Sequence, residues 1–302
     1  MYEIIFAIIF LLIGIFLIIF SSKIAVKHSA IIATALGVSP LIIGLSLVSI
    51  GTDLPEIFNS IISCSLGHGD IDVGDSVGSD LTQLTLVFGL LPIICGSFKV
   101  DRKEIIVLGG CEILSLIVIY TIVEKGYFTR LNALIMVGSL VIYLIIINNV
   151  TKESILERVD LLEKTEITRS KSFHIIIASL GFIGVAIGAY AIVQSIITLS
   201  SMFQVHEYII SFFIAAVGTS LPELVVDINA IREKHYKIAI GDIVGSCIVD
   251  STLSIGIGQV LFPQAISAEL AVPTILYTLF ASLIVFAIVA VRKKMDKKAG
   301  II

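Results

Sequence analysis

The chain has 302 residues and a formal net charge of −4, and 57% of its residues are hydrophobic while 15% are charged. Its mean hydropathy of +1.08 excludes an ordinary soluble domain, and no nucleic-acid partner is expected. The N-terminus, Met1-Tyr2-Glu3, lacks the basic region and cleavage site of a secretory signal, so the first apolar segment is expected to be a retained membrane span.

Apolar segments of about 20 residues, the length that crosses a bilayer, follow one another along the chain. They predict nine membrane-spanning helices, with approximate bounds of 3–21, 40–66, 72–97, 104–123, 128–149, 173–198, 208–231, 238–261 and 269–291. The expected fold class is therefore all-α, a polytopic membrane protein. The four cysteines have no CxxC spacing, which favours packing over a disulfide or a metal site.

Lysine and arginine alternate between the two sides of the predicted spans. Eighteen of the 20 lie on one side, and only Lys125 and Arg130 lie on the other. Under the positive-inside rule, this places the N-terminus outside the cell and the charged linker, residues 150–172, in the cytoplasm. A multi-pass protein of the cell membrane is predicted. The linker is either a short amphipathic helix or a solvated tether, and the tether is favoured.

Two polar blocks inside the apolar segments occur twice, both at an offset of 167 residues. Gly51-Thr52-Asp53-Leu54-Pro55-Glu56 recurs as Gly218-Thr219-Ser220-Leu221-Pro222-Glu223, and Gly74-Asp75-Ser76-Val77-Gly78-Ser79 recurs as Gly241-Asp242-Ile243-Val244-Gly245-Ser246. The first block lies on the second span and its copy on the seventh, which crosses the membrane in the opposite direction. Two inverted-topology repeats of five spans each, residues 1–149 and 173–302, are therefore predicted. Nine spans are visible, so the tenth is expected to be absent or truncated.

The repeated block contains the groups of a cation site. Proline has no N–H and clashes with the carbonyl four residues earlier, so Pro55 and Pro222 are expected to break their helices and free the carbonyls of Gly51 and Gly218. Such backbone persists at membrane depth only where it lines a cavity or is buried by protein. Carbonyls, hydroxyls and carboxylates form an all-oxygen cage, which hard cations such as Ca²⁺ and Na⁺ prefer. An ion site between inverted repeats is typical of a transporter.

The spacing of the polar residues supports such a site. A hydroxyl residue precedes an acid or amide by four positions, and so shares its helical face, in four places: Thr52 and Glu56, Thr219 and Glu223, Ser79 and Gln83, and Ser246 and Asp250. Each charged carboxylate near the bilayer centre costs about 2.5–3.5 kcal/mol, and a bound cation or proton is the available compensation. An ion site is therefore favoured over a structural role for Glu56, Glu223 and Asp250.

At these residues the chain resembles the sodium/calcium exchangers of the cation/calcium exchanger superfamily, whose two alpha repeats carry G-T-S-L-P-E followed by G-N-x-x-G-S-N. The resemblance covers both repeats and implies that Glu56 and Glu223 are central ligands shared by Ca²⁺ and Na⁺. It implies that Asp250 and Gln83 face the middle. The flanking sites would be completed by Thr52, Thr219, Ser220, Ser79 and Ser246, with the carbonyls near Ser49 and Ala216.

The chain departs from that family pattern at several positions. Asp53 replaces the serine of the first repeat, Asp75 and Asp242 replace asparagine, and Gln83 stands where a shorter amide is usual. Asp53 adds a carboxylate to what would be a neutral-ligand Na⁺ site, which makes it a further candidate metal ligand. It could strengthen divalent binding, accept a proton or admit a different cation, because neighbouring carboxylates repel one another.

Other acidic residues carry separate hypotheses. A buried, hydrogen-bonded acid is favoured over a transport ligand for Glu112. Asp227 is equally suited to an entry acid and to a supporting group. Three aspartates are expected at or near the outer end of the third span, either as a cation-attracting vestibule or as solvated loop acids: Asp70, Asp72 and Asp80.

The predicted function is a membrane antiporter, not an enzyme, which exchanges Ca²⁺ for Na⁺ by alternating access at a carboxylate site near the bilayer midplane. The alternative is a Ca²⁺ antiporter coupled to H⁺ or another cation. A remote alternative, an intramembrane aspartyl protease, rests only on the string Gly67-His68-Gly69-Asp70. No prosthetic group is expected. The expected partners are Ca²⁺ and Na⁺, with H⁺ as the other candidate ion, and the lipid bilayer, and a monomer is predicted.

Overall fold

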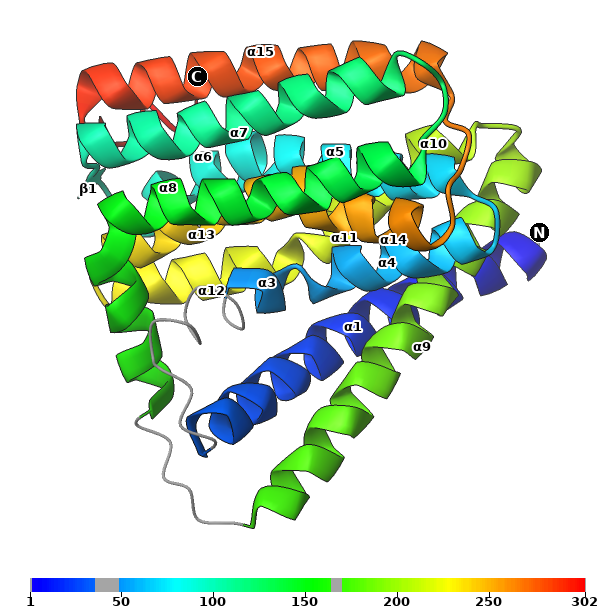
Figure 1. The fold of residues 1–302 in the computed structure, drawn as a ribbon, viewed down its shortest axis with the longest axis horizontal. Coiled ribbons are helices and arrows are strands. Elements are labelled where there is room, and N and C mark those ends of the chain that lie inside the picture. The colour runs from blue at the N-terminus through cyan, green and yellow to red at the C-terminus, as the bar shows by residue number, and fades with distance from the viewer. Residues whose placement is uncertain (1, 36–48, 164–169, 302) are drawn as a thin grey trace.

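Helices make up nearly all of the structure, a computed structural model that describes residues 2–35, 49–163 and 170–301 (Figure 1). The long helices are α1 (Tyr2–Ala35), α7 (Arg102–Val123), α8 (Arg130–Glu163), α9 (Lys171–Phe203) and α15 (Ala268–Arg292). The shorter segments of the first half are α3 (Ser49–Thr52), α4 (Leu54–Ser65), α5 (Gly69–Leu81), η2 (Thr82–Val87) and α6 (Phe88–Ile94). Those of the second half are α10 (Glu207–Ile210), η3 (Ser211–Ala215), α11 (Ala216–Thr219), α12 (Leu221–Arg232), α13 (Tyr236–Val249), η4 (Asp250–Ser254) and α14 (Ile255–Leu261).

Eight helical stretches of the described chain are long and apolar enough to cross a membrane: 2–33, 69–94, 102–123, 130–147, 171–203, 207–232, 236–261 and 268–292. They match eight of the nine predicted spans and confirm an all-α, polytopic membrane protein. The remaining predicted span, 40–66, falls partly on residues 36–48, outside the described residues, and its described part forms α3 and α4.

Two predicted boundaries are wrong. The first span was expected to end at residue 21, but α1 continues through Lys23 and Lys27 to Ala35, because isolated charges near a helix end do not break a helix. The fifth span was expected to end at residue 149 and to be followed by a linker that is either a short amphipathic helix or a tether, with the tether favoured. Helix α8 continues to Glu163, so the first part of that linker is helical.

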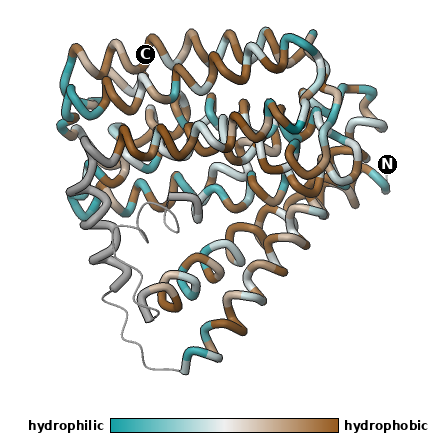
Figure 2. The backbone as a smooth tube through the Cα atoms, in the orientation of Figure 1, coloured by the Kyte–Doolittle hydropathy of each residue, from teal (hydrophilic) through white to brown (hydrophobic). Residues whose placement is uncertain are grey.

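The helices form three layers (Figure 1). The crossed pair α1 and α9 lies on one side, α7, α8 and α15 lie on the other, and the shorter segments fill the middle. Figure 2 shows hydrophobic residues along the long outer helices, and large apolar side chains such as Phe16 and Phe280 are exposed there. A bilayer would solvate these side chains, which explains why they need no cover from the protein.

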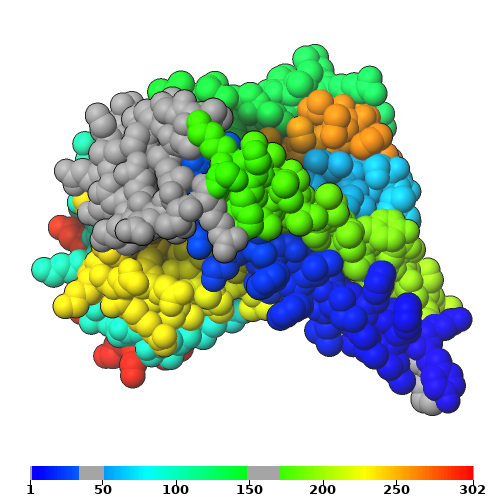
Figure 3. All heavy atoms as spheres, turned by 90° about the horizontal axis from the view of Figure 1, so that it is seen from below, coloured from blue at the N-terminus to red at the C-terminus, as the bar shows by residue number. Residues whose placement is uncertain are grey.

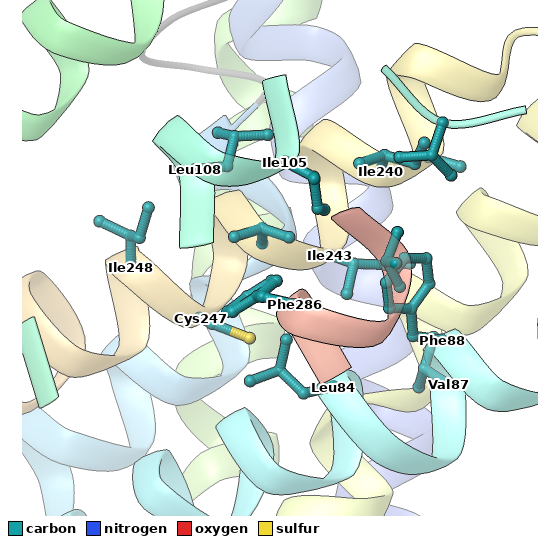
Figure 4. Close-up of a cluster of buried hydrophobic side chains, with 14 of the residues drawn as sticks. Leu84, Val87, Phe88, Ile105, Leu108, Ile240, Ile243, Cys247, Ile248 and Phe286 are labelled. Atoms are coloured by element: carbon teal, nitrogen blue, oxygen red, sulfur yellow. The ribbon is translucent and has the colours of Figure 1, made fainter. Parts of the chain in front are cut away.

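Apolar clusters hold the layers together, and Figure 4 shows one of them. Leu84 and Phe88, from η2 and α6, pack there with Leu108 of α7, Ile243 of α13 and Phe286 of α15. This cluster joins the outer layer to the middle layer near one end of the bundle. At the same end, strands β1 (Phe98–Lys99) and β2 (Lys294–Met295) pair in antiparallel fashion.

The segment after α15 is fixed by a charged turn. Arg292 Nη2 donates to both carboxylate oxygens of Asp296 at 2.8 Å. The N–H of Ala299 and the guanidinium of Arg292 lower the pKa of Asp296 to about 2. The described residues after Arg292 thus form a strand and turns, where the sequence left room for the start of a tenth span.

Small residues allow the helices to approach closely. A Cβ built on Gly188 of α9 would lie 2.9 Å from the Gly14 carbonyl oxygen of α1, so the two backbones are nearly in contact. Figure 3 shows α1 (blue) and α9 (green) side by side across the face of the molecule that they form. Most of the two helices' contacts are with each other, so they form a pair against the rest of the bundle.

The repeat-related glycines Gly78 and Gly245 give a matched test of close packing. A Cβ on Gly78 would lie 2.3 Å from the Phe212 carbonyl oxygen, whereas no described atom lies within 4 Å of a Cβ on Gly245. Overpacking of this kind costs about 1–3 kcal/mol. We expect Gly78→Ala to lower the melting temperature of the detergent-solubilised protein by a few degrees and Gly245→Ala to leave it unchanged. Equal melting temperatures for the two variants would contradict this packing.

Candidate functional site

Two interrupted helices meet in the middle layer. The break between α3 and α4 falls at Asp53 and that between α11 and α12 at Ser220, the repeat-related positions. Their backbones are nearly identical, with φ −84° and ψ 11° at Asp53 and φ −80° and ψ 0° at Ser220. In both copies the proline lies in the first turn of the second helix, where its missing N–H is tolerated. The structure confirms the predicted breaks.

A second irregularity, missed by the sequence analysis, also repeats. The helices after α5 and α13 widen into the π-helical segments η2 (Thr82–Val87) and η4 (Asp250–Ser254), which contain Gln83 and Asp250. Such segments carry an extra residue in a helical turn and are frequent at functional sites. No local sequence signal announces them, because the extra residue is accommodated by packing.

Three carboxylates converge at the helix breaks. Asp53, Glu56 and Glu223 each place one oxygen within 4.8 Å of the others, and none is more than 1% exposed. Among the residues that the structure describes, none is a hydrogen-bond partner of the four carboxylate oxygens of Glu56 and Glu223. Both glutamates occupy the first turn of their helix, where the positive end of the helix dipole stabilises a carboxylate. Asp53 lies in this cluster, although its role as a ligand stays a prediction.

Hydroxyls and a backbone carbonyl border the carboxylates and join the two repeats. Thr219 Oγ1 lies 3.3 Å from Ser79 Oγ of α5 and 3.3 Å from the Ala216 carbonyl oxygen. Ser79 Oγ and Ser220 Oγ also donate to Ala216, at 3.5 and 2.8 Å. The Ala216 carbonyl, predicted as a ligand, is therefore surrounded by three predicted hydroxyl ligands.

Asp75 and Asn59 connect to this site, and the sequence analysis did not assign them there. Thr219 Oγ1 donates to Asp75 Oδ1 at 3.3 Å, and Asn59 Nδ2 donates to Asp75 Oδ2. Both side chains are buried. The position of Asn59, three residues after Glu56 on α4, was the signal that could have found it.

The remaining predicted ligands occupy different positions around the cluster. Asp250 Oδ1 accepts a bond from Ser254 Oγ at 3.2 Å, and its Oδ2 has no hydrogen-bond partner among the described residues. The charge of Asp250 interacts with those of Glu56 and Asp53. Gln83 Oε1 lies 3.5 Å from Cys247 Sγ. Three other predicted ligands remain. Ser246 is buried, and its Oγ has no hydrogen-bond partner among the described residues. Thr52 is half-buried at the end of α3, and Ser49 begins α3, but its side chain lies outside the described part of the structure.

The structure revises the other acidic hypotheses. Asp72 and Asp80 are 1% and 0% exposed, so they are neither vestibule nor loop acids, because α5 runs through the centre of the bundle. Asp70 is bonded to the N–H and hydroxyl of Ser267 at the α5 start, both at 2.7 Å. Glu112 is a buried acid that accepts a bond from Ser282 Oγ at 2.8 Å, as expected. Asp227 is buried on α12 and stays undecided between its two roles.

The site concentrates negative charge without a basic side chain. Buried charged residues of the described chain include Asp53, Glu56, Glu223 and Asp250, and no lysine or arginine is among them. A charged carboxylate in an apolar layer needs a cation or a proton to balance it. The carboxylate, hydroxyl and carbonyl oxygens that meet here are of the kind that hard metal ions prefer as ligands.

A polytopic membrane protein with buried carboxylates at paired helix breaks belongs, by fold and site, among the ion transporters. The sequence profile of the family described as "Sodium/calcium exchanger protein" matches residues 6–148 and 173–302. The chain therefore belongs to the sodium/calcium exchanger family, as its repeated motifs indicated.

Known proteins share the sequence and the fold over most of the chain. The protein named "Putative antiporter CaxA" of Alkalimonas amylolytica is 28% identical over 275 residues, which cover 88% of this chain and 84% of that protein. The structure of the sodium-calcium exchanger NCX_Mj is similar with a TM-score of 0.59, 24% identity and coverage of 99% and 95%. That of the H⁺/Ca²⁺ exchanger CAX has a TM-score of 0.74, 14% identity and coverage of 97% and 78%. These two likenesses show the fold.

We expect repulsion within the Asp53, Glu56 and Glu223 cluster to make the stability of the protein depend on bound cations. A divalent cation at 100 times its dissociation constant stabilises a protein by about 2.7 kcal/mol. We expect Ca²⁺ to raise the melting temperature in a chelator-treated preparation, and Glu223→Gln to reduce that rise. A rise of equal size in Glu223→Gln would show that Ca²⁺ acts elsewhere.

Proposed function

We propose that the protein is an antiporter of the cell membrane that exchanges Ca²⁺ for Na⁺ by alternating access at the carboxylate cluster. The observation that carries the proposal is the convergence of Asp53, Glu56 and Glu223 within 4.8 Å in the apolar interior. Membership of the sodium/calcium exchanger family supports the choice of ions. The oxygen ligands proposed around these carboxylates are Thr52, Ser79, Gln83, Thr219, Ser220, Ser246 and Asp250, with the carbonyls of Ser49 and Ala216.

Charge explains why such a site exchanges ions instead of passing one ion alone. The empty site carries several uncompensated carboxylates, which are costly to move through an apolar layer. One Ca²⁺ or several Na⁺ neutralise it, and because Glu56 and Glu223 serve both ions, the ions compete. Only a loaded site then changes its exposure at low cost, which couples the two fluxes.

The crossed pair α1 and α9 is the proposed moving element. These helices pack mainly on each other, and Gly14, Gly181 and Gly188 let their backbones approach closely. Movement of the pair past the middle layer would expose the carboxylates to one side and then the other. In this proposal the N-terminus is outside. Lys23 and Lys27 lie in the C-terminal half of α1 and Lys171 lies at the N-terminal end of α9, and the positive-inside rule places these lysines in the cytoplasm.

Coupling to protons is the second candidate, and Asp53 favours it. The cluster holds three carboxylates within 4.8 Å, one more than the two glutamates of the family pattern. Like charges at that separation favour the uptake of a proton. A Ca²⁺/H⁺ exchange at the same site would then use Asp53 as the proton acceptor.

The deciding experiment measures ⁴⁵Ca²⁺ uptake into proteoliposomes that hold the purified protein. An outward Na⁺ gradient, an outward K⁺ gradient and a pH gradient are applied in parallel. Uptake driven by Na⁺ supports the proposal, and uptake driven only by the pH gradient supports the proton-coupled candidate. No uptake under any gradient would refute Ca²⁺ as the substrate.

Glu56→Gln and Glu223→Gln are expected to reduce Ca²⁺ flux to the level of empty liposomes. The change keeps the size of each side chain but removes a charge that no neighbouring group replaces. Glu269→Gln, at an exposed acid near the start of α15, is the matched control and should keep wild-type flux. Wild-type flux in either central variant would remove these glutamates from the site.

Asp53→Ser is expected to change ion preference while transport continues. It restores the serine that Ser220 holds in the second repeat and removes one of three clustered charges. We expect the affinity for Ca²⁺ to fall by tenfold or more, since the loss of about 1.4 kcal/mol of attraction is a factor of ten. We also expect the Ca²⁺ flux to depend less on pH. The half-saturating Ca²⁺ concentration measured between pH 6 and pH 8 tests this. Identical values in both proteins would place Asp53 outside the ion-binding shell.

A further inference from the structure

A stripe of polar residues leads away from the carboxylate cluster along α4. Glu56, Asn59, Ser60, Ser63 and Cys64 follow one another at helical spacing and are all buried. Helix α5 runs back alongside α4, and α14 packs against both. Cys64 lies eight residues from Glu56, about 12 Å along the helix, so the stripe extends well beyond the central site.

Asp72 of α5 lies at the far end of this stripe, among fixed donors. Its Oδ2 accepts bonds from Gln259 Nε2 of α14 at 2.8 Å and from Cys64 Sγ at 3.3 Å. Gln264 Nε2 donates to the Cys64 carbonyl oxygen at 3.0 Å, and the Gln264 N–H donates to Gln259 Oε1 at 3.0 Å. One carboxylate oxygen of Asp72 is therefore held by donors from α4 and α14, and Gln264 holds both donors in place.

The other side of the same group is unsatisfied. Among the residues that the structure describes, Asn59 Oδ1 has no hydrogen-bond partner, and the buried Asp72 Oδ1 and Ser60 Oγ have none besides the contact between the Ser60 hydroxyl and the Asp72 carboxylate. The Ser60 hydroxyl lies beside the Asp72 carboxylate and under Gly258 of α14, where a Cβ would come within 2.3 Å of Ser60 Oγ. Buried polar atoms are normally fully paired, so these buried oxygens along one stripe leave room for a partner that carries positive charge.

The repeat shows that the fold does not need this arrangement. At the offset of 167 residues, Cys64 corresponds to Ile231, Asp72 to Ala239 and Gln259 to Pro92. In the second half α12 and α13 pack on each other as α4 and α5 do, and the corresponding apolar residues are buried as well. The polar group around Asp72 therefore occurs in one half only, whereas Ile, Ala and Pro pack at the corresponding positions of the other half.

We infer that Asp72, with Ser60 and Asn59, forms a second cation site for an alkali-metal ion, separate from the central cluster. The ligands are oxygens, which suit a hard cation. The neighbouring carboxylate of Asp75 accepts bonds from Asn59 and Thr219, so Asp72 is the one carboxylate among the proposed ligands. One carboxylate balances one positive charge, whereas a divalent ion would leave an excess charge in the apolar layer. The site therefore takes Na⁺ or K⁺ in preference to Ca²⁺.

The position of the site suggests what it does. It lies toward the ends of α4 and α5 that the proposed orientation places outside, and Asn59 and Asp75 join it to Thr219 at the central cluster. Resting on the proposed antiport function, the Asp72 site is a station that an alkali ion occupies between the outer surface and the carboxylates. Its existence as a binding site does not depend on that function.

Equilibrium binding to the purified full chain tests the inference, with ²²Na⁺ and with ⁸⁶Rb⁺ as a substitute for K⁺. Asp72→Asn keeps the size of the side chain and an acceptor for Gln259 but removes the charge. We expect it to bind one alkali ion fewer per chain than the wild type, for at least one of the two ions, with ⁴⁵Ca²⁺ binding unchanged. Ser60→Ala should weaken the same class of sites severalfold without removing it, and a melting curve for each variant verifies folding.

Asp70→Asn is the matched control, because Asp70 lies two residues earlier on α5 and has both oxygens bonded to Ser267. It should bind as many ions as the wild type. Equal Na⁺ and Rb⁺ stoichiometry in wild type and Asp72→Asn overturns the inference, as does a wild type that binds neither ion. If the wild type neither binds nor transports Ca²⁺ but shows alkali-ion binding that depends on Asp72, the proposed function alone is refuted.

Discussion

Buried negative charge without a basic partner is the constraint on which the structure depends. Asp53, Glu56, Glu223 and Asp250 lie at or near zero exposure in the middle layer, and no lysine or arginine of the described chain is buried with them. The cost of holding those charges in an apolar layer is offset only in part by the first turns of α4 and α12. A bound cation or proton is the available compensation for the rest, and in the proposed function a cation supplies it.

The interrupted helices follow from the same constraint. A continuous helix would consume its backbone groups in its own hydrogen bonds and offer the ion only side chains. The breaks at Asp53 and Ser220 turn two helix starts toward one point. The π-helical segment η4 brings Asp250 beside α4, and η2 places Gln83 against α13. The surrounding long helices bury this irregular backbone, which is the condition for its survival at membrane depth.

The two halves are similar in backbone and different in charge. At the offset of 167 residues, Asp53 corresponds to Ser220, Asp72 to Ala239 and Glu112 to Leu279. The first half therefore carries more buried acids than the second on the same plan.

Sequence alone determined the class of fold and the central residues. Hydropathy predicted eight of the spans now seen in the described chain, and the doubled Gly-Thr-x-Leu-Pro-Glu block predicted the helix breaks, because proline and glycine act locally. It also singled out Asp53, Glu56 and Glu223, whose charges are anomalous in any apolar segment.

Only the tertiary structure decided which distant groups meet. The convergence of Asp53 with Glu223, the bond from Thr219 to Asp75, and the burial of Asp72 and Asp80 depend on how α4, α5, α11 and α12 pack. The helical continuation of α8 and the π-helical turns likewise depend on packing. Local sequence specifies what a segment can form, whereas contacts between segments 140 residues or more apart are selected by the energy of the whole bundle.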